Sequence, residues 1–116
     1  MNVFFDVQGT LLAGNVPRPY VREVFLELDA RGHDVHLWSS AGADYAERAA
    51  GLLGVGDLVL GCWSKFTPPP FSVDYVVDDH PDFAEHHGGY AISPFGGDPE
   101  DRELWGVPEA VEARRA

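Results

Sequence analysis

The chain has 116 residues, a net charge of −11 at pH 7 and a single cysteine, Cys62. Its length fits one domain, residues 1–116, and its 45% hydrophobic and 23% charged residues are typical of a globular protein. The negative charge argues against nucleic acid as a partner, because such binding depends mainly on Lys and Arg. No apolar run approaches the ~20 residues that cross a bilayer, so no membrane contact is expected. A single cysteine allows no intrachain disulfide, which favours a reducing, cytoplasmic location.

Predicted strands and helices alternate along the first half of the chain. In chain order they are a strand at 2–6, a turn or small hairpin at 9–15, a helix between Pro19 and Gly32, a strand at 35–38 and a helix at 42–53. The first helix carries apolar residues at helical spacing, except that Leu26 lies off the stripe, which is consistent with a second covered side. Gly54 is expected to end the second helix.

The second half of the chain continues this alternation. In order it contains a strand at 58–60, an extended connector at 67–70, a strand at 73–77, a helical turn at 81–86, a strand at 90–92, a polar loop at 96–101 and a helix at 107–115. Three consecutive prolines exclude a helix in the connector. Alternating strands and helices pack best as a mostly parallel sheet with helices on both faces. We therefore predict an α/β domain with a five-stranded, three-layer, Rossmann-like architecture.

Polar residues end several of the predicted strands. Asp6 ends the first strand, Ser39 follows the second, and Asp78 and Asp79 follow the fourth. Ligands of open parallel sheets bind at the carboxyl ends of the strands, so these side chains are expected in one crevice. Three close carboxylates repel one another, and Mg²⁺ with substrate phosphate would relieve that repulsion. The alternative is that each acid merely caps a strand end or a helix start.

Four segments resemble the signatures of the haloacid dehalogenase (HAD) superfamily, in the family's order across residues 3–79. Val3 to Leu11 reads VFFDVQGTL, which is similar to the signature D-x-D-G-T-L/V after apolar residues. The strand that ends at Ser39, the isolated Lys65, and the strand that ends in Asp78 and Asp79 are similar to the other three. The resemblance implies a HAD fold, and the stretches where family members carry a cap domain are too short here to hold one.

The resemblance also implies roles for individual residues. Asp6 would be the nucleophile that forms a phosphoaspartate, and Lys65, the only lysine, would neutralise charge beside it. Coding bias toward arginine could equally explain a lone lysine. Mg²⁺ would be held by Asp6, the backbone carbonyl of Gln8, and Asp78 or Asp79. The candidate substrate-binding residues are Gly9, Thr10, Ser39, Ser40 and Lys65.

Gln8 departs from the family pattern, which in its phosphatases has an aspartate that donates and accepts a proton. A carboxamide cannot exchange a proton near neutral pH, and loss of general acid–base catalysis costs ~10²–10⁴-fold. Three outcomes stay open: reaction only with good leaving groups, the chemistry of another branch of the superfamily, or a fold that binds without turnover. The expected function is a slow or specialised phosphohydrolase or phosphotransferase. Its rival is an inactive binding module for a phosphate ligand or a protein partner.

Several other features allow two interpretations. The substrate would be a phosphorylated small molecule or a phosphoprotein, and a capless site could be closed by homo-oligomerisation. His80 follows the paired acids as a substrate contact or as an ordinary loop residue, and His86 lies at a solvated helix end. The acidic stretch 98–103 is expected to be a solvated turn, with Ca²⁺ binding as the alternative. A receiver-like phosphoacceptor domain is disfavoured, because its acid pair would follow the first strand.

Overall fold

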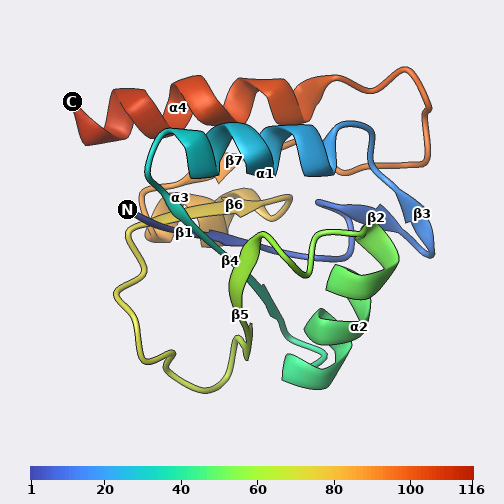
Figure 1. The fold of residues 1–116 in the computed structure, drawn as a ribbon, viewed down its shortest axis with the longest axis horizontal. Coiled ribbons are helices and arrows are strands. Elements are labelled where there is room, and N and C mark those ends of the chain that lie inside the picture. The colour runs from blue at the N-terminus through green and yellow to red at the C-terminus, as the bar shows by residue number, and fades with distance from the viewer.

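Five parallel strands form the centre of the computed structural model, which describes residues 1–116 (Figure 1). The strand order is β5-β4-β1-β6-β7, and every neighbouring pair is parallel. The strands in this order are β5 (Val59–Ser64), β4 (Asp34–Ser39), β1 (Asn2–Phe5), β6 (Tyr75–Asp78) and β7 (Tyr90–Ala91). This arrangement confirms the α/β class and the three-layer, Rossmann-like architecture with a five-stranded sheet.

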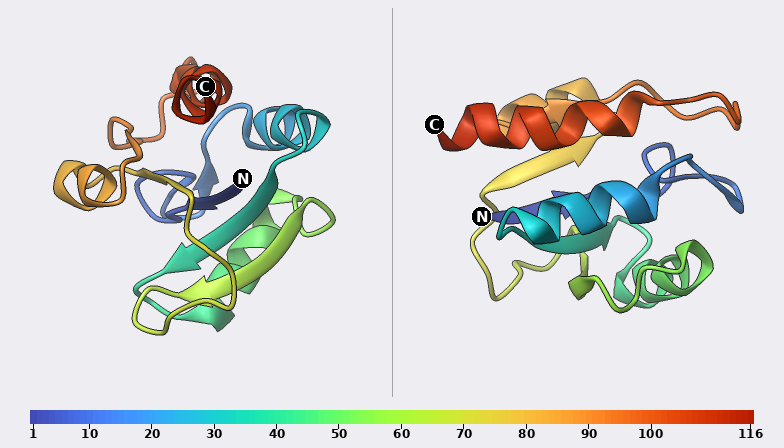
Figure 2. Two further views of the ribbon diagram at one scale, coloured as in Figure 1. Left: turned by 90° about the vertical axis from the view of Figure 1, so that its left-hand side faces the viewer. Right: turned by 45° about the horizontal axis from the view of Figure 1, so that its top comes forward.

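Helices cover the two faces of the sheet unequally. They are α1 (Val21–Ala30), α2 (Ala43–Leu53), α3 (Pro81–His86), α4 (Gly106–Arg115) and the single 3-10 turn η1 (Glu103–Trp105). Buried residues of α1, α2 and α4 share one core cluster with Val3 and Phe5 of the central strand. On the other face Phe4 packs with Trp38 and with Phe83 of α3. Figure 2 shows α1 and α3 on opposite sides of the sheet. None of these helices is long and apolar enough to span a bilayer.

A small hairpin follows the first strand, as predicted. Its antiparallel strands are β2 (Leu12–Ala13) and β3 (Val16–Pro17). The loop before it is held by backbone hydrogen bonds, because the N–H groups of Leu11 and Leu12 both donate to the Val7 carbonyl. The hairpin therefore begins directly beside the carboxyl end of β1.

Three sequence predictions differ from the structure. The strand predicted at 58–60 is β5, which extends to Ser64; Gly61 interrupts its apolar pattern, yet it pairs with His36, and a Cβ at Gly61 would collide with the Trp63 indole. The strand predicted at 73–77 lies at Tyr75–Asp78, because pairing with β1 sets its register. Leu26 is 44% exposed, so the second covered side expected for it is absent at this residue.

Candidate functional site

Strand register brings the first two acids together. Phe5 of β1 pairs with Val77 of β6, and the Asp6 N–H continues this pairing by donating to the Val77 carbonyl at 3.0 Å. Asp6 therefore lies beside Asp78, the last residue of β6, and Asp79 follows directly. Asp78 is fully buried and Asp6 is 6% exposed. We call Asp6, Asp78 and Asp79 the acid cluster.

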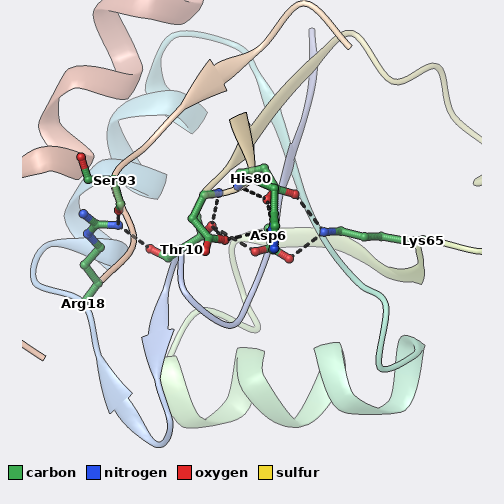
Figure 3. Close-up of polar contacts among 8 residues, drawn as sticks. Asp6, Thr10, Arg18, Lys65, His80 and Ser93 are labelled. Carbon is green, nitrogen blue, oxygen red and sulfur yellow. Dashed lines mark hydrogen bonds and ion pairs between the residues drawn. The ribbon is translucent and has the colours of Figure 1, made fainter. Parts of the chain in front are cut away.

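Lys65 bridges two members of the acid cluster (Figure 3). Its Nζ donates to Asp6 Oδ1 and to Asp78 Oδ2, both at 2.8 Å. The Lys65 N–H donates to the Ser39 carbonyl at 3.0 Å, which fixes the residue after β5 beside the end of β4. Burial lowers the pKa of the Lys65 ammonium, but the two carboxylates outweigh burial and raise the pKa overall. Lys65 therefore stays charged and neutralises part of the cluster.

The loop after β1 holds the remaining carboxylate in place. The Thr10 hydroxyl lies 3.1 Å from Asp6 Oδ2 and 3.2 Å from Asp79 Oδ1, and it accepts the Asp79 N–H at 3.1 Å. Gly9 has a φ of +83°, and a Cβ there would collide with the Asp79 carboxylate. Glycine is needed at this position for both its conformation and its small size. Thr10 is fully buried, so its hydroxyl positions the acids and is not exposed to a substrate.

The acid cluster carries more negative charge than its neighbours neutralise. Burial and the nearby Asp79 raise the pKa of Asp6 to about 6, despite the opposing effect of Lys65. His80 also lies at the site, with Nδ1 3.1 Å from Asp78 Oδ1. The hydrogen bond to Asp78 and the charge of Asp79 raise the pKa of the His80 imidazole. The cluster is thus poised to accept a cation.

The donor atoms of the site fit a divalent cation. One donor atom from each of Asp6, Asp78, Asp79 and His80 can be chosen so that all four lie within 4.8 Å of one another. The Gln8 carbonyl accepts no backbone hydrogen bond, and its coordination of the cation stays a prediction. Carboxylate and carbonyl oxygens are the ligands that Mg²⁺ prefers.

The Gln8 side chain is directed at the hairpin. Its Nε2 donates to the Gly14 carbonyl at 2.7 Å and to the Tyr45 hydroxyl, while its Oε1 accepts the Gly14 N–H at 3.1 Å. Both ends of the amide are therefore engaged away from the acid cluster. The side chain connects the hairpin to α2, and no hydrogen bond joins it to Asp6.

The two serines stay apart from the carboxylates. The Ser39 hydroxyl is buried and accepts the Ala41 N–H at 3.0 Å, and Ser40 is exposed. Neither hydroxyl forms a hydrogen bond with the acid cluster. Phosphate binding by Ser39 and Ser40 therefore stays a prediction, although Ser39 does position Lys65 through its carbonyl oxygen.

Arg18 supports the site and was not among the candidates from the sequence. Its fully buried guanidinium donates to both carboxylate oxygens of Asp101, at 2.9 and 3.0 Å, and to the carbonyls of Thr10 and Ser93, at 3.2 and 3.0 Å. Glu103 lies 3.6 Å from the same guanidinium. Arg18 thus ties the Thr10 loop to the segment after β7 (Figure 3).

The acidic stretch at 98–103 is a solvated turn only in part. Asp98, Glu100 and Arg102 are exposed, as its composition predicts. Asp101 and Glu103 instead lie beside the buried Arg18 guanidinium, which holds the pKa of the Asp101 carboxyl below its usual value. The ion pair spans 83 residues of sequence, and no local pattern indicates it.

Comparison with known proteins identifies no relative: no protein-family model matches the chain, and no curated protein shows significant similarity to it. The site itself is therefore the basis for assigning a function.

Proposed function

We propose that the protein is a Mg²⁺-dependent phosphotransferase or phosphohydrolase that acts through Asp6. The observation that carries this proposal is the position of Asp6, held by Lys65 beside Asp78 and Asp79 at the carboxyl edge of a parallel sheet. The resemblance of residues 3–79 to the HAD superfamily supports the same assignment.

Asp6 has the environment of a nucleophile. Lys65 contacts Oδ1 and the Thr10 hydroxyl lies 3.1 Å from Oδ2, so Oδ2 keeps a lone pair for attack on phosphorus. With a pKa of about 6 the carboxyl is largely ionised at neutral pH. Attack forms a bond from the Asp6 oxygen to phosphorus, and the bond to the leaving oxygen breaks with its electron pair. The Lys65 ammonium offsets the negative charge that gathers on the transferring group.

Asp6, Asp79 and the Gln8 carbonyl would hold Mg²⁺. When bound, the ion would screen the charge between the carboxylate and an incoming phosphate. Because the acid cluster repels anions, we expect no phosphate to bind without a cation.

The engaged Gln8 amide favours leaving groups that need no proton. An alkoxide must be protonated as it departs, and no carboxylic acid occupies the position two residues after Asp6. The leaving groups of acyl and aryl phosphates are much weaker bases. We therefore propose such phosphates as substrates, with slow hydrolysis of the phosphoaspartate that forms.

The missing carboxylic acid at residue 8 also favours one rival function. In this rival the protein is a module that binds a phosphorylated small molecule or a phosphoprotein without turnover. In either case we propose that it acts in a reducing, cytoplasmic compartment, which the single Cys62 suggests.

Acetyl phosphate tests the proposal directly. Wild type incubated with acetyl phosphate and Mg²⁺ should gain the mass of one phosphoryl group, and hydroxylamine should remove it. Asp6→Asn should gain none, whereas the control Asp29→Asn, an exposed residue of α1, should behave like wild type.

The rival predicts a different result. It predicts no covalent product, but Mg²⁺-dependent binding of beryllofluoride, a phosphate mimic, to wild type. If wild type shows neither the covalent product nor this binding, both proposals are wrong.

A further inference from the structure

His80 places an imidazole at the acid cluster. Its Nδ1 lies 3.1 Å from Asp78 Oδ1 and 3.6 Å from Asp79 Oδ1, although 73% of the side chain is exposed. The Nδ1 edge of the ring therefore faces the carboxylates, while the rest of the ring is open to solvent. Its donor atom belongs to the group of four that lie within 4.8 Å of one another.

The backbone fixes where this imidazole is presented. The His80 N–H donates to Asp78 Oδ1 at 2.9 Å, and Pro81 begins α3 directly afterwards. Lys65 takes the other oxygen, Oδ2, of the same carboxylate. Asp78 Oδ1 thus faces His80 on the side of the cluster that Lys65 does not occupy.

We propose that His80 supplies a nitrogen ligand to the cation site, and that the site therefore selects a first-row divalent transition metal ion over Mg²⁺. This inference rests on the cation site of the proposed function and replaces Mg²⁺ as the ion that the site holds most tightly. Mg²⁺ prefers an all-oxygen shell, whereas an imidazole nitrogen raises the affinity for ions such as Co²⁺ and Zn²⁺. Three carboxylates alone would give a smaller preference for these ions.

Calorimetric titration of the tag-free protein with Co²⁺ and with Mg²⁺ tests this inference at pH 7.5. We expect wild type to bind Co²⁺ more tightly than Mg²⁺. His80→Ala should weaken Co²⁺ binding by about 10-fold or more, the cost that perturbed ligand shells commonly show. The same variant should change Mg²⁺ affinity much less. The visible absorption of bound Co²⁺ should also shift between wild type and His80→Gln, because an amide oxygen would replace the ring nitrogen.

His86→Ala is the matched control, since it removes an exposed histidine from α3, the helix that His80 precedes. It should leave both affinities unchanged. Equal Co²⁺ affinities in wild type and His80→Ala would overturn the inference, as would a wild type that prefers Mg²⁺ or binds neither ion. The covalent labelling of Asp6 by acetyl phosphate with Mg²⁺ is measured separately, so each of these results leaves the proposed function to be judged on its own.

Discussion

Two groups of charged side chains meet at Thr10, and they are built on opposite principles. In the first, the buried guanidinium of Arg18 donates to both oxygens of Asp101 and to two carbonyls. In the second, three carboxylates of the acid cluster share one lysine and an exposed histidine. Charge is matched by hydrogen bonds in the first group and left in excess in the second.

The pKa values show what this difference means. Arg18 lowers the pKa of Asp101, so ionisation of that carboxyl favours the folded state. Burial and Asp79 raise the pKa of Asp6 to about 6, so ionisation of that carboxyl costs folding free energy. A group that stabilises the fold needs no further explanation, whereas a destabilising cluster at the edge of a sheet is a candidate for function.

Removal of the Arg18 guanidinium should have the largest effect on the stability of the fold. Arg18→Leu leaves the partly buried Asp101 and the carbonyls of Thr10 and Ser93 without their donor, and losing hydrogen bonds to a charged group in this way costs about 3 kcal/mol. We expect that decrease in the free energy of unfolding, measured by urea denaturation. Arg22→Ala is the control, because its ion pair with Asp57 is exposed and should contribute little. Equal losses in the two variants would contradict a structural role for Arg18.

Asp101→Asn should destabilise the protein by about 2 kcal/mol at pH 7, because it replaces a charged hydrogen-bond acceptor with a neutral one. The folded-state pKa of Asp101 lies below its unfolded value, so its stabilisation is present above the unfolded value and disappears as pH falls through the folded one. The difference between wild type and variant should therefore shrink in acid. A difference that is constant with pH would show that charge is not its cause.

Asp6→Asn should stabilise the protein, whereas Asp101→Asn should destabilise it. In EDTA at pH 7 we expect a gain of about 1–2 kcal/mol, because the folded protein no longer ionises a carboxyl whose pKa is raised from 3.8 to about 6. The folded state binds more protons than the unfolded one between these pH values, so wild-type stability falls as pH rises through them. The gain of the variant should vanish below about pH 4. Loss of stability in Asp6→Asn would mean that Lys65 fully neutralises the cluster.

The sequence predicts the second group better than the first for a physical reason. Parallel strands end at one edge of a sheet, so the order of strands alone places Asp6 and Asp78 together. Arg18 lies directly between two prolines, where the sequence has neither helical nor strand periodicity. Its partner Asp101 is 83 residues away. Such a contact depends on the path of the segment after β7, which no local pattern determines.

For the fold, too, local patterns are predicted from the sequence and long-range contacts are not. Alternating apolar segments predict the parallel sheet and its helices, since each periodicity is local. The length of β5 is set by its pairing with β4, so Gly61 misleads a prediction that considers one segment alone. The direction of the Gln8 side chain is also a tertiary property, because its partner Tyr45 comes from α2.

The smallest expected effect concerns Gln8. This residue is close to Asp6 in sequence, but its side chain forms no hydrogen bond with the acid cluster. Gln8→Glu keeps the side-chain length and the acceptor for the Gly14 N–H, but it loses the donor to the Gly14 carbonyl. Because this hydrogen bond is exposed, we expect a loss below about 1 kcal/mol. Tyr45→Phe, which removes only the other partner of the amide, should cost no more.

Gln8→Glu also tests whether a side chain at residue 8 can reach Asp6. If the hairpin holds residue 8 away from Asp6, the new carboxylate cannot protonate a leaving group there, and Gln8→Glu should hydrolyse an alkyl phosphate no faster than wild type. A clear gain in hydrolysis would show that the side chain reaches the acid cluster. The missing carboxyl at residue 8 would then be the feature that separates wild type from a protein that hydrolyses alkyl phosphates.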